Sequence, residues 1–276
     1  MDYVKPADVV VSMIDAGKRK AALPVRDLLI RGALSGGLLG IATSLAITAA
    51  VQTSVPIVGA LIFPVGFVMI VLLGLDLVTG SFALLPMAQM DGASGWREVF
   101  RNWTWVFIGN LVGSLLYALM LWASLTMFGQ IPGGMVADRI VAITESKTIA
   151  YAAHGDAGWA TAFVKAMLCN WMVTMGVVMS MVSSSTVSKI VAAWLPITIF
   201  FGLGYEHTVV NMFLIPAGIL LGAKTTIGDW WFWNQIPVTL GNLAGGFFFT
   251  GLALYWTYRV RATPMRSGET AAQTSS

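Results

Sequence analysis

The chain has 276 residues, of which 57% are hydrophobic and only 11% charged, with a mean hydropathy of +0.78. Soluble domains carry about a quarter charged residues, so this composition excludes an ordinary soluble domain. The net charge of +3 comes without a basic cluster interleaved with aromatics, which excludes a nucleic-acid-binding protein, and Cys169 is the only cysteine, which excludes an intrachain disulfide.

The N-terminal segment, residues 1–25, predicts a cytoplasmic amphipathic helix that precedes the membrane domain. Val9, Val10, Met13 and Ile14 share one face of a helix that begins near Pro6. Acidic residues and the lack of an apolar core in residues 1–31 argue against a cleavable signal peptide. The helix is expected to lie against the membrane or the protein, and a gating role stays open.

Six membrane spans are expected within a channel domain at 26–260, because the long charge-free runs exceed the roughly 20 apolar residues that a span needs. The predicted spans are 28–52, 56–90 with a break at Asp76–Ser81, 102–128, 160–182, 190–221 with a break at Gly202–His207, and 235–258. The segments 91–101, 129–159 and 222–233 are expected to be polar loops, and 261–276 a flexible cytoplasmic tail.

The distribution of basic residues predicts the orientation of the spans. Of 16 Lys and Arg residues, only Arg139, Lys147 and Lys224 fall in outside segments when both termini are cytoplasmic, and Lys165 lies within the fourth span. The positive-inside rule therefore favours cytoplasmic termini.

Two matched landmarks indicate that the chain contains two halves with one plan. Asp76 stands 10 residues before Pro86, as Glu206 stands 10 before Pro216, and Gly109-Asn110 is answered by Gly241-Asn242. Three spans in each half give the halves opposite topologies. Paired, interrupted apolar segments in such halves indicate a transport site.

The second break carries the strongest candidate for chemistry, His207, because an imidazole titrates near neutral pH and is able to donate to an anion. Glu206 and Asp76 either cap the half-helices that follow them, which we favour, or relay protons. Thr79 and Thr208 offer hydroxyl donors. Lys165 either draws anions inward or extends to the headgroups.

Phe63, Phe67 and Phe200 precede the breaks and either pack the core or form an apolar constriction. The sequence has two His, one Cys and no phosphate-binding loop or Gly-x-Ser-x-Gly turn, which argues against an enzyme and predicts no metal or cofactor.

Five ordered motifs carry a family resemblance: Gly-Leu-Asp-Leu-Val-Thr-Gly (74–80), Asn102-Trp103 with Gly109-Asn110-Leu111-Val112-Gly113, Cys169-Asn170-Trp171, residues 204–213, and residues 236–242. From about residue 5 to 260 the chain resembles the formate/nitrite transporter family. That resemblance implies homopentameric channels of the bacterial inner membrane, in which each protomer has six spans in an inverted, aquaporin-like 3+3 repeat.

The resemblance also implies roles for particular residues. His207 matches the central histidine that faces the anion, and Thr79, Leu77 and Val78 match the loop that interrupts the second span. Phe63, Phe67 and Phe200 match an apolar constriction on the cytoplasmic side, and Asn170 and Asn242 match pore-region asparagines. A lysine that many members carry before the fourth span aligns here with His154.

The function expected from these residues is a path for a small monovalent anion, most of all formate, with protonation or hydrogen bonding by His207. A nitrite or hydrosulfide channel of the same architecture is the first alternative. A proton-coupled secondary transporter or a membrane enzyme subunit is the alternative of another class.

Overall fold

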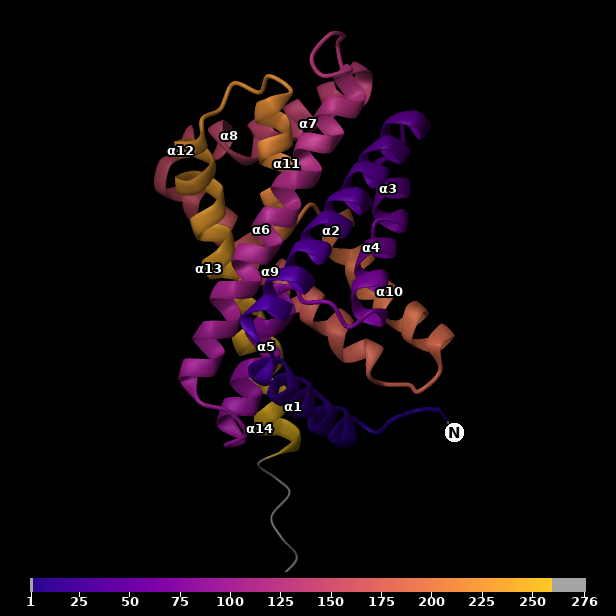
Figure 1. The fold of residues 1–276 in the computed structure, drawn as a ribbon, viewed down its shortest axis with the longest axis vertical. Coiled ribbons are helices and arrows are strands. Elements are labelled where there is room, and N and C mark those ends of the chain that lie inside the picture. Colours follow the sequence, from indigo (N-terminus) through magenta and orange to yellow (C-terminus); the bar gives the residue numbers. More distant parts are fainter. Residues whose placement is uncertain (1, 260–276) are drawn as a thin grey trace, which may run out of the picture.

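A computed structural model describes residues 2–259 (Figure 1). Over these residues the chain is helical without a strand, and one isolated bridge joins Tyr3 to Ser183. The all-α prediction is therefore confirmed for the described part. The tail predicted for 261–276 lies outside the described residues.

The helices follow one another with short connections. In chain order they are α1 Pro6–Ala22, α2 Val25–Thr53, α3 Pro56–Ile62, α4 Pro64–Leu72, α5 Val78–Met90, α6 Trp96–Thr126, α7 Gly134–Lys147, α8 Ile149–Ala152, α9 Gly155–Ser180, α10 Thr186–Gly202, α11 Thr208–Leu220, α12 Ile227–Trp230, η1 Trp231–Gln235, α13 Ile236–Ala244, η2 Gly245–Leu252 and α14 Ala253–Tyr258.

Four helical stretches in the described part are long and apolar enough to cross a bilayer. They are Val25–Thr53, Trp96–Thr126, Gly155–Ser180 and Ile227–Tyr258, the last being the run from α12 to α14. Shorter apolar helices occupy Pro56–Leu72, Thr186–Gly202 and Thr208–Leu220. Helices thus occur at all six predicted spans, four of which are continuous and long enough.

All three predicted loops are partly wrong, and the segment 222–233 contains α12 and the start of η1. Residues 96–101 belong to α6, because the Glu98 carboxylate accepts from the Gly95 backbone N–H and starts the helix early. The segment 129–159 contains α7 and α8, whose polar composition hid their helical structure. Polarity marks exposure to water and not the absence of a helix.

The α1 helix lies against the body of the protein, as its apolar face predicts. Val9, Val10, Met13 and Ile14 are buried, and the helix packs mainly on α5 and also touches α6 and α14. Figure 1 shows α1 at the same end of the molecule as α14. Gly17 permits the close approach, because a Cβ there would overlap the Leu84 carbonyl oxygen.

The most extensive helix–helix contact in the described part joins α2 to α6 through small residues. A Cβ on Gly113 of α6 would overlap the Ala33 carbonyl oxygen of α2. A Cβ on Gly37, on the same side of α2, would stand 3.8 Å from its nearest neighbour, the Gly113 carbonyl oxygen.

We expect the Gly113→Ala substitution to force α2 and α6 apart and to destabilise the protein by about 1–3 kcal/mol, the usual effect of overpacking. The matched Gly37→Ala substitution is expected to be neutral. Heating of both variants in detergent, followed by size-exclusion chromatography, measures the difference. Equal loss of folded protein in the two variants would contradict the packing argument.

Candidate functional site

Two helix interruptions with matching geometry face each other in the fold. The chain leaves α4 and α10 through left-handed glycines, Gly74 with φ 64° and Gly204 with φ 65°. The residue after each glycine donates its backbone N–H to a carbonyl near the end of the preceding helix. Leu75 donates to the Ile70 carbonyl at 3.0 Å, and Tyr205 donates to the Phe200 carbonyl at 3.1 Å. The next helices begin at Val78 and Thr208, so the first interruption covers residues 73–77 and lies slightly earlier than predicted.

Two buried asparagines hold these interruptions in the same way. The Asn110 side-chain oxygen accepts from the Val78 N–H at 3.0 Å, and its amide donates to the Asp76 carbonyl at 2.9 Å. The Asn242 oxygen accepts from the Thr208 N–H at 2.8 Å, and its amide donates to the Glu206 carbonyl at 2.9 Å. The repeated Gly-Asn landmark therefore marks the side chains that cap both half-helices.

We expect Asn242→Ala to leave the Thr208 backbone N–H and the Glu206 carbonyl unsatisfied in a buried site, and to remove a second donor from the Ala166 carbonyl within α9. Each unsatisfied buried group costs about 1–3 kcal/mol. Asn242→Asp keeps the acceptor for Thr208 but sets a carboxylate oxygen against the two carbonyls in a buried site, so its thermal stability in detergent is expected to fall at least as far as that of Asn242→Ala. Wild-type stability of Asn242→Ala would refute this role.

The expectation that Asp76 and Glu206 cap the half-helices is wrong, because the first backbone N–H groups donate to Asn110, Asn242 and His207 instead. The Asp76 carboxylate accepts instead from the Lys20 ammonium of α1. Glu206 accepts from the Lys147 ammonium at 2.7 Å and the Tyr151 hydroxyl at 2.8 Å. Each interruption thus has a buried acid paired with a lysine from an adjacent helix.

Glu206 lies in a dense polar network. Besides Lys147 and Tyr151, the Asn211 amide donates to its carboxylate at 2.8 Å. Burial and the adjacent Glu206 carboxylate raise the pKa of Tyr151 above its ordinary value, so this phenol stays protonated and donates. The network fixes the residue that immediately precedes His207.

His207 is itself the N-cap of α11 and is 2% exposed. Its Nδ1 atom accepts from the Val209 N–H at 3.1 Å and the Val210 N–H at 3.2 Å. Two donors at Nδ1 leave the proton of a neutral imidazole on Nε2. The Nε2 atom lies 3.4 Å from the Thr79 hydroxyl oxygen, which brings the two interruptions together.

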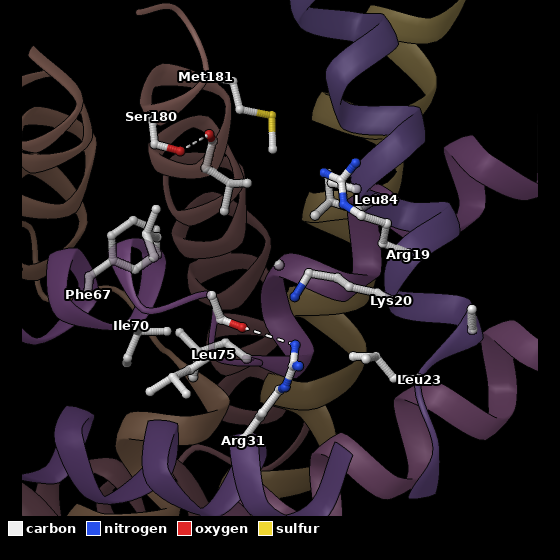
Figure 2. A pocket seen from close by; sticks show the side chains of 17 residues that line it. Arg19, Lys20, Leu23, Arg31, Phe67, Ile70, Leu75, Leu84, Ser180 and Met181 are labelled. Atoms are coloured by element: carbon white, nitrogen blue, oxygen red, sulfur yellow. Dashed lines mark hydrogen bonds between the residues drawn. The ribbon is translucent and has the colours of Figure 1, made fainter. Parts of the chain in front are cut away.

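Two cavities approach this pair from opposite sides. One, of about 620 Å³, is lined by Phe67 and Leu77 and is bounded by α1 (Figure 2). The other, of about 470 Å³, is lined by Phe200 and His207. One buried apolar cluster, called the apolar layer below, contains Phe67 and Leu77 from the first lining, Phe200 from the second, and Val78.

The predicted aromatic constriction divides between the two sides. Phe67 lines the cavity beside α1, whereas Phe200 lines the opposite cavity and stacks on His207 with a ring separation of 5.6 Å. Phe63 packs edge-on against Phe200 at 5.5 Å. The assignment of all three to one side is therefore wrong, because Phe67 and Phe200 line different cavities and the buried Phe63 lines neither of the two.

Asn170 connects the two interruptions from α9. Its amide donates to the Thr79 carbonyl at 3.1 Å and to the Asn242 carbonyl at 2.6 Å. The structure thus brings together His207, Thr79, Leu77, Val78, Asn170 and Asn242.

Lys165 does not line either cavity, and its ammonium lies 5.9 Å from the centre of the Tyr151 ring. His154 is the residue immediately before α9. The lysine that lines the second cavity is Lys147, and Arg139 joins it in the lining. We missed both because they lie in a segment interpreted as a loop.

Within residues 2–259, no three His, Cys, Asp or Glu side chains gather into a metal-binding group. The charged and polar groups of the site instead flank a narrow apolar layer between two cavities. Together with the long apolar helices, this arrangement defines the class of the protein as a helical membrane transport protein.

Comparisons with known proteins agree on a family. The family described as Formate/nitrite transporter matches residues 7–256, so the chain belongs to the formate/nitrite transporter family and is a transport protein, not an enzyme. The uncharacterized transporter YrhG of Bacillus subtilis is 32% identical over 94% of this chain and 95% of its own. The formate channel FocA of Escherichia coli K12 is 30% identical over 94% of this chain and 96% of its own. A solved structure described as a pentameric formate channel with formate bound has a TM-score of 0.70 and 25% identity, covering 85% of this chain and 97% of that chain.

Proposed function

We propose that the protein is a homopentameric channel for small monovalent anions, with formate as its main substrate. Family membership supports this proposal, as do relatives described as formate channels and the similarity to a formate-bound pentamer. The single observation that carries it is the His207 Nε2 atom, which faces Thr79 at 3.4 Å between the two cavities.

We place the protein in a bacterial inner membrane as six spans in an inverted 3+3 repeat, with the second and fifth broken at mid-membrane and both termini cytoplasmic. The matching glycine turns and asparagine caps of the two interruptions support the repeat. Residues 26–260 then form the channel domain, and α1 lies on the cytoplasmic side. The excess of Lys and Arg in the inside segments supports this orientation.

Permeation requires that formate cross an apolar layer. Moving a bare carboxylate into apolar surroundings costs many kcal/mol, so formate crosses as a hydrogen-bonded or protonated species. Since Nδ1 of His207 already accepts from two backbone N–H groups, His207 acts as an Nε2–H donor that replaces water around the anion. The proton that neutralises formate comes from the solvent of the cavities.

Permeability of the purified protein in liposomes tests the proposal. Formate, nitrite and hydrosulfide are compared at two pH values, and formate flux is expected to be the fastest and to rise at the lower pH. Empty liposomes supply the background. Formate flux equal to that background would reject the proposal.

The same measurement separates the alternatives. Faster nitrite or hydrosulfide flux would favour the channel of the same architecture with another substrate. A fixed ratio of protons to anions against a gradient would favour a proton-coupled transporter. The sequence similarity to formate channels favours a formate channel over both alternatives.

A further inference from the structure

The cavity beside α1 has a strongly cationic lining. Its lining includes Arg19 and Lys20 from the end of α1 and Arg31 from α2. Its volume of about 620 Å³ lies in the range of small-molecule binding sites. Figure 2 shows the Lys20 and Arg31 side chains pointing toward one another across the cavity, with Arg19 farther along the same wall.

Little in the described part of the chain neutralises these three cations. None of the lining residues is acidic, and the buried Asp76 pairs with Lys20. Arg31 makes one long contact, 3.5 Å to the Gly74 carbonyl, and no hydrogen bond or ion pair joins Arg19 to another described residue. Two guanidinium charges, those of Arg19 and Arg31, therefore lack a counter-charge.

The opposite cavity provides an internal comparison. Its lining cations are Lys147 and Arg139, and Lys147 is paired with Glu206. One cation without an acidic partner remains there, against two beside α1. The charge excess is therefore asymmetric, although the two interruptions match closely in their backbone geometry.

We propose that the cavity beside α1 binds a compact divalent oxyanion, such as sulfate, hydrogen phosphate or a short dicarboxylate, and that the bound dianion slows formate entry from this side. Guanidinium groups bind planar pairs of oxygens with parallel hydrogen bonds, which suits this ligand class. The occupant lies over Phe67 and Leu77, where the cavity meets the apolar layer. The effect on flux rests on the proposed function, whereas the binding does not.

Calorimetric titration of the purified protein with sulfate tests the binding at constant ionic strength, with chloride as the monovalent reference. Arg31→Gln and Arg19→Gln are each expected to weaken sulfate binding about tenfold, the effect of losing one charge-assisted hydrogen bond. Lys18→Gln is the matched control, because Lys18 is exposed on the same helix, carries the same charge and does not line the cavity. Binding of neither sulfate nor the dicarboxylate succinate by the unmodified protein, or equal losses in Lys18→Gln and the arginine variants, would overturn the site.

Titration with succinate separates the possible sources of the dianion. Binding of sulfate alone assigns the site to inorganic or phosphate-type oxyanions, and binding of succinate alone assigns it to dicarboxylates. Either result supports the divalent class, and binding of neither overturns it.

Formate flux with sulfate on one side of the liposomes tests the block. We expect flux to fall at least twofold when sulfate is on the α1 side and to stay unchanged when it is on the other side, and we expect no fall on either side in Arg19→Gln. Equal flux with sulfate on either side would overturn the block. Loss of all formate flux without sulfate would reject the proposed function while leaving the calorimetric result standing.

Discussion

A channel with leucine in place of His207 is expected to lose at least tenfold in formate permeability. The substitution removes the Nε2 atom that faces Thr79 between the cavities. A hydrogen bond to a charged group contributes about 1.5–3 kcal/mol, and each 1.4 kcal/mol corresponds to a factor of ten. Formate efflux from liposomes, normalised to the amount of folded protein, gives the measurement.

His207→Leu also removes the acceptor for the Val209 and Val210 N–H groups, so a loss of stability could imitate a loss of permeation. His207→Asn is the control, because the asparagine oxygen is a good cap and accepts from the same backbone donors. We expect the leucine variant alone to lose about 1 kcal/mol of stability, while both lose permeability. A permeable His207→Asn channel with unchanged pH dependence would show that the imidazole is not required.

The sequence predicted the two interruptions because their signals are local. A glycine, an acid and a later proline recur at one spacing in both halves, and Gly74 and Gly204 do adopt the left-handed conformation that such turns need. His207 was predicted for the same reason, as an ionisable residue inside an apolar run.

Contacts between distant segments could not be predicted in this way. Asn110 lies 32 residues from Val78, and nothing near Asn110 says that its side chain replaces a local cap. Lys147 lies 59 residues from Glu206, at the end of the polar helix α7. The repeat did offer a signal. Asp76 and Glu206 occupy matched positions in the two halves, so a lysine paired with the buried acid of one half indicates a cationic partner for the buried acid of the other half.

The wrong assignment of the three phenylalanines to one side of the protein shows the same limit of prediction from sequence. Phe63 and Phe67 are four residues apart in one predicted span, which suggests a single face and a common side. Pro64 interrupts that span, so that α3 ends at Ile62 and α4 begins at Pro64. The ring of Phe63 then stacks on Phe201, 4.0 Å away, while Phe67 faces the cavity of α1.

The second large effect is expected at the buried pair of Lys147 and Glu206. Removing one partner of a buried ion pair costs about 3–5 kcal/mol, because the remaining charge is left without compensation. The Glu206 side chain is 2% exposed and that of Lys147 is 15% exposed. We therefore expect Lys147→Met, which strands the deeper charge, to be more destabilising than Glu206→Gln, whose remaining ammonium reaches the water of the cavity.

The double variant Lys147→Met with Glu206→Gln leaves no unpaired charge, and the amide still accepts from Tyr151, so it is expected to recover most of the stability lost by Lys147→Met. Arg259→Met is the matched control, since its pair with Asp91 is 44% and 19% exposed and exposed pairs contribute about 0–1 kcal/mol. The fraction of protein that survives heating in detergent orders the four variants. Equal losses in Lys147→Met and Arg259→Met, or no recovery in the double variant, would mean that Glu206 is held by its neutral donors and not by the lysine. In that case the Lys147 ammonium would not be needed to neutralise Glu206 and would be available to attract the permeating anion.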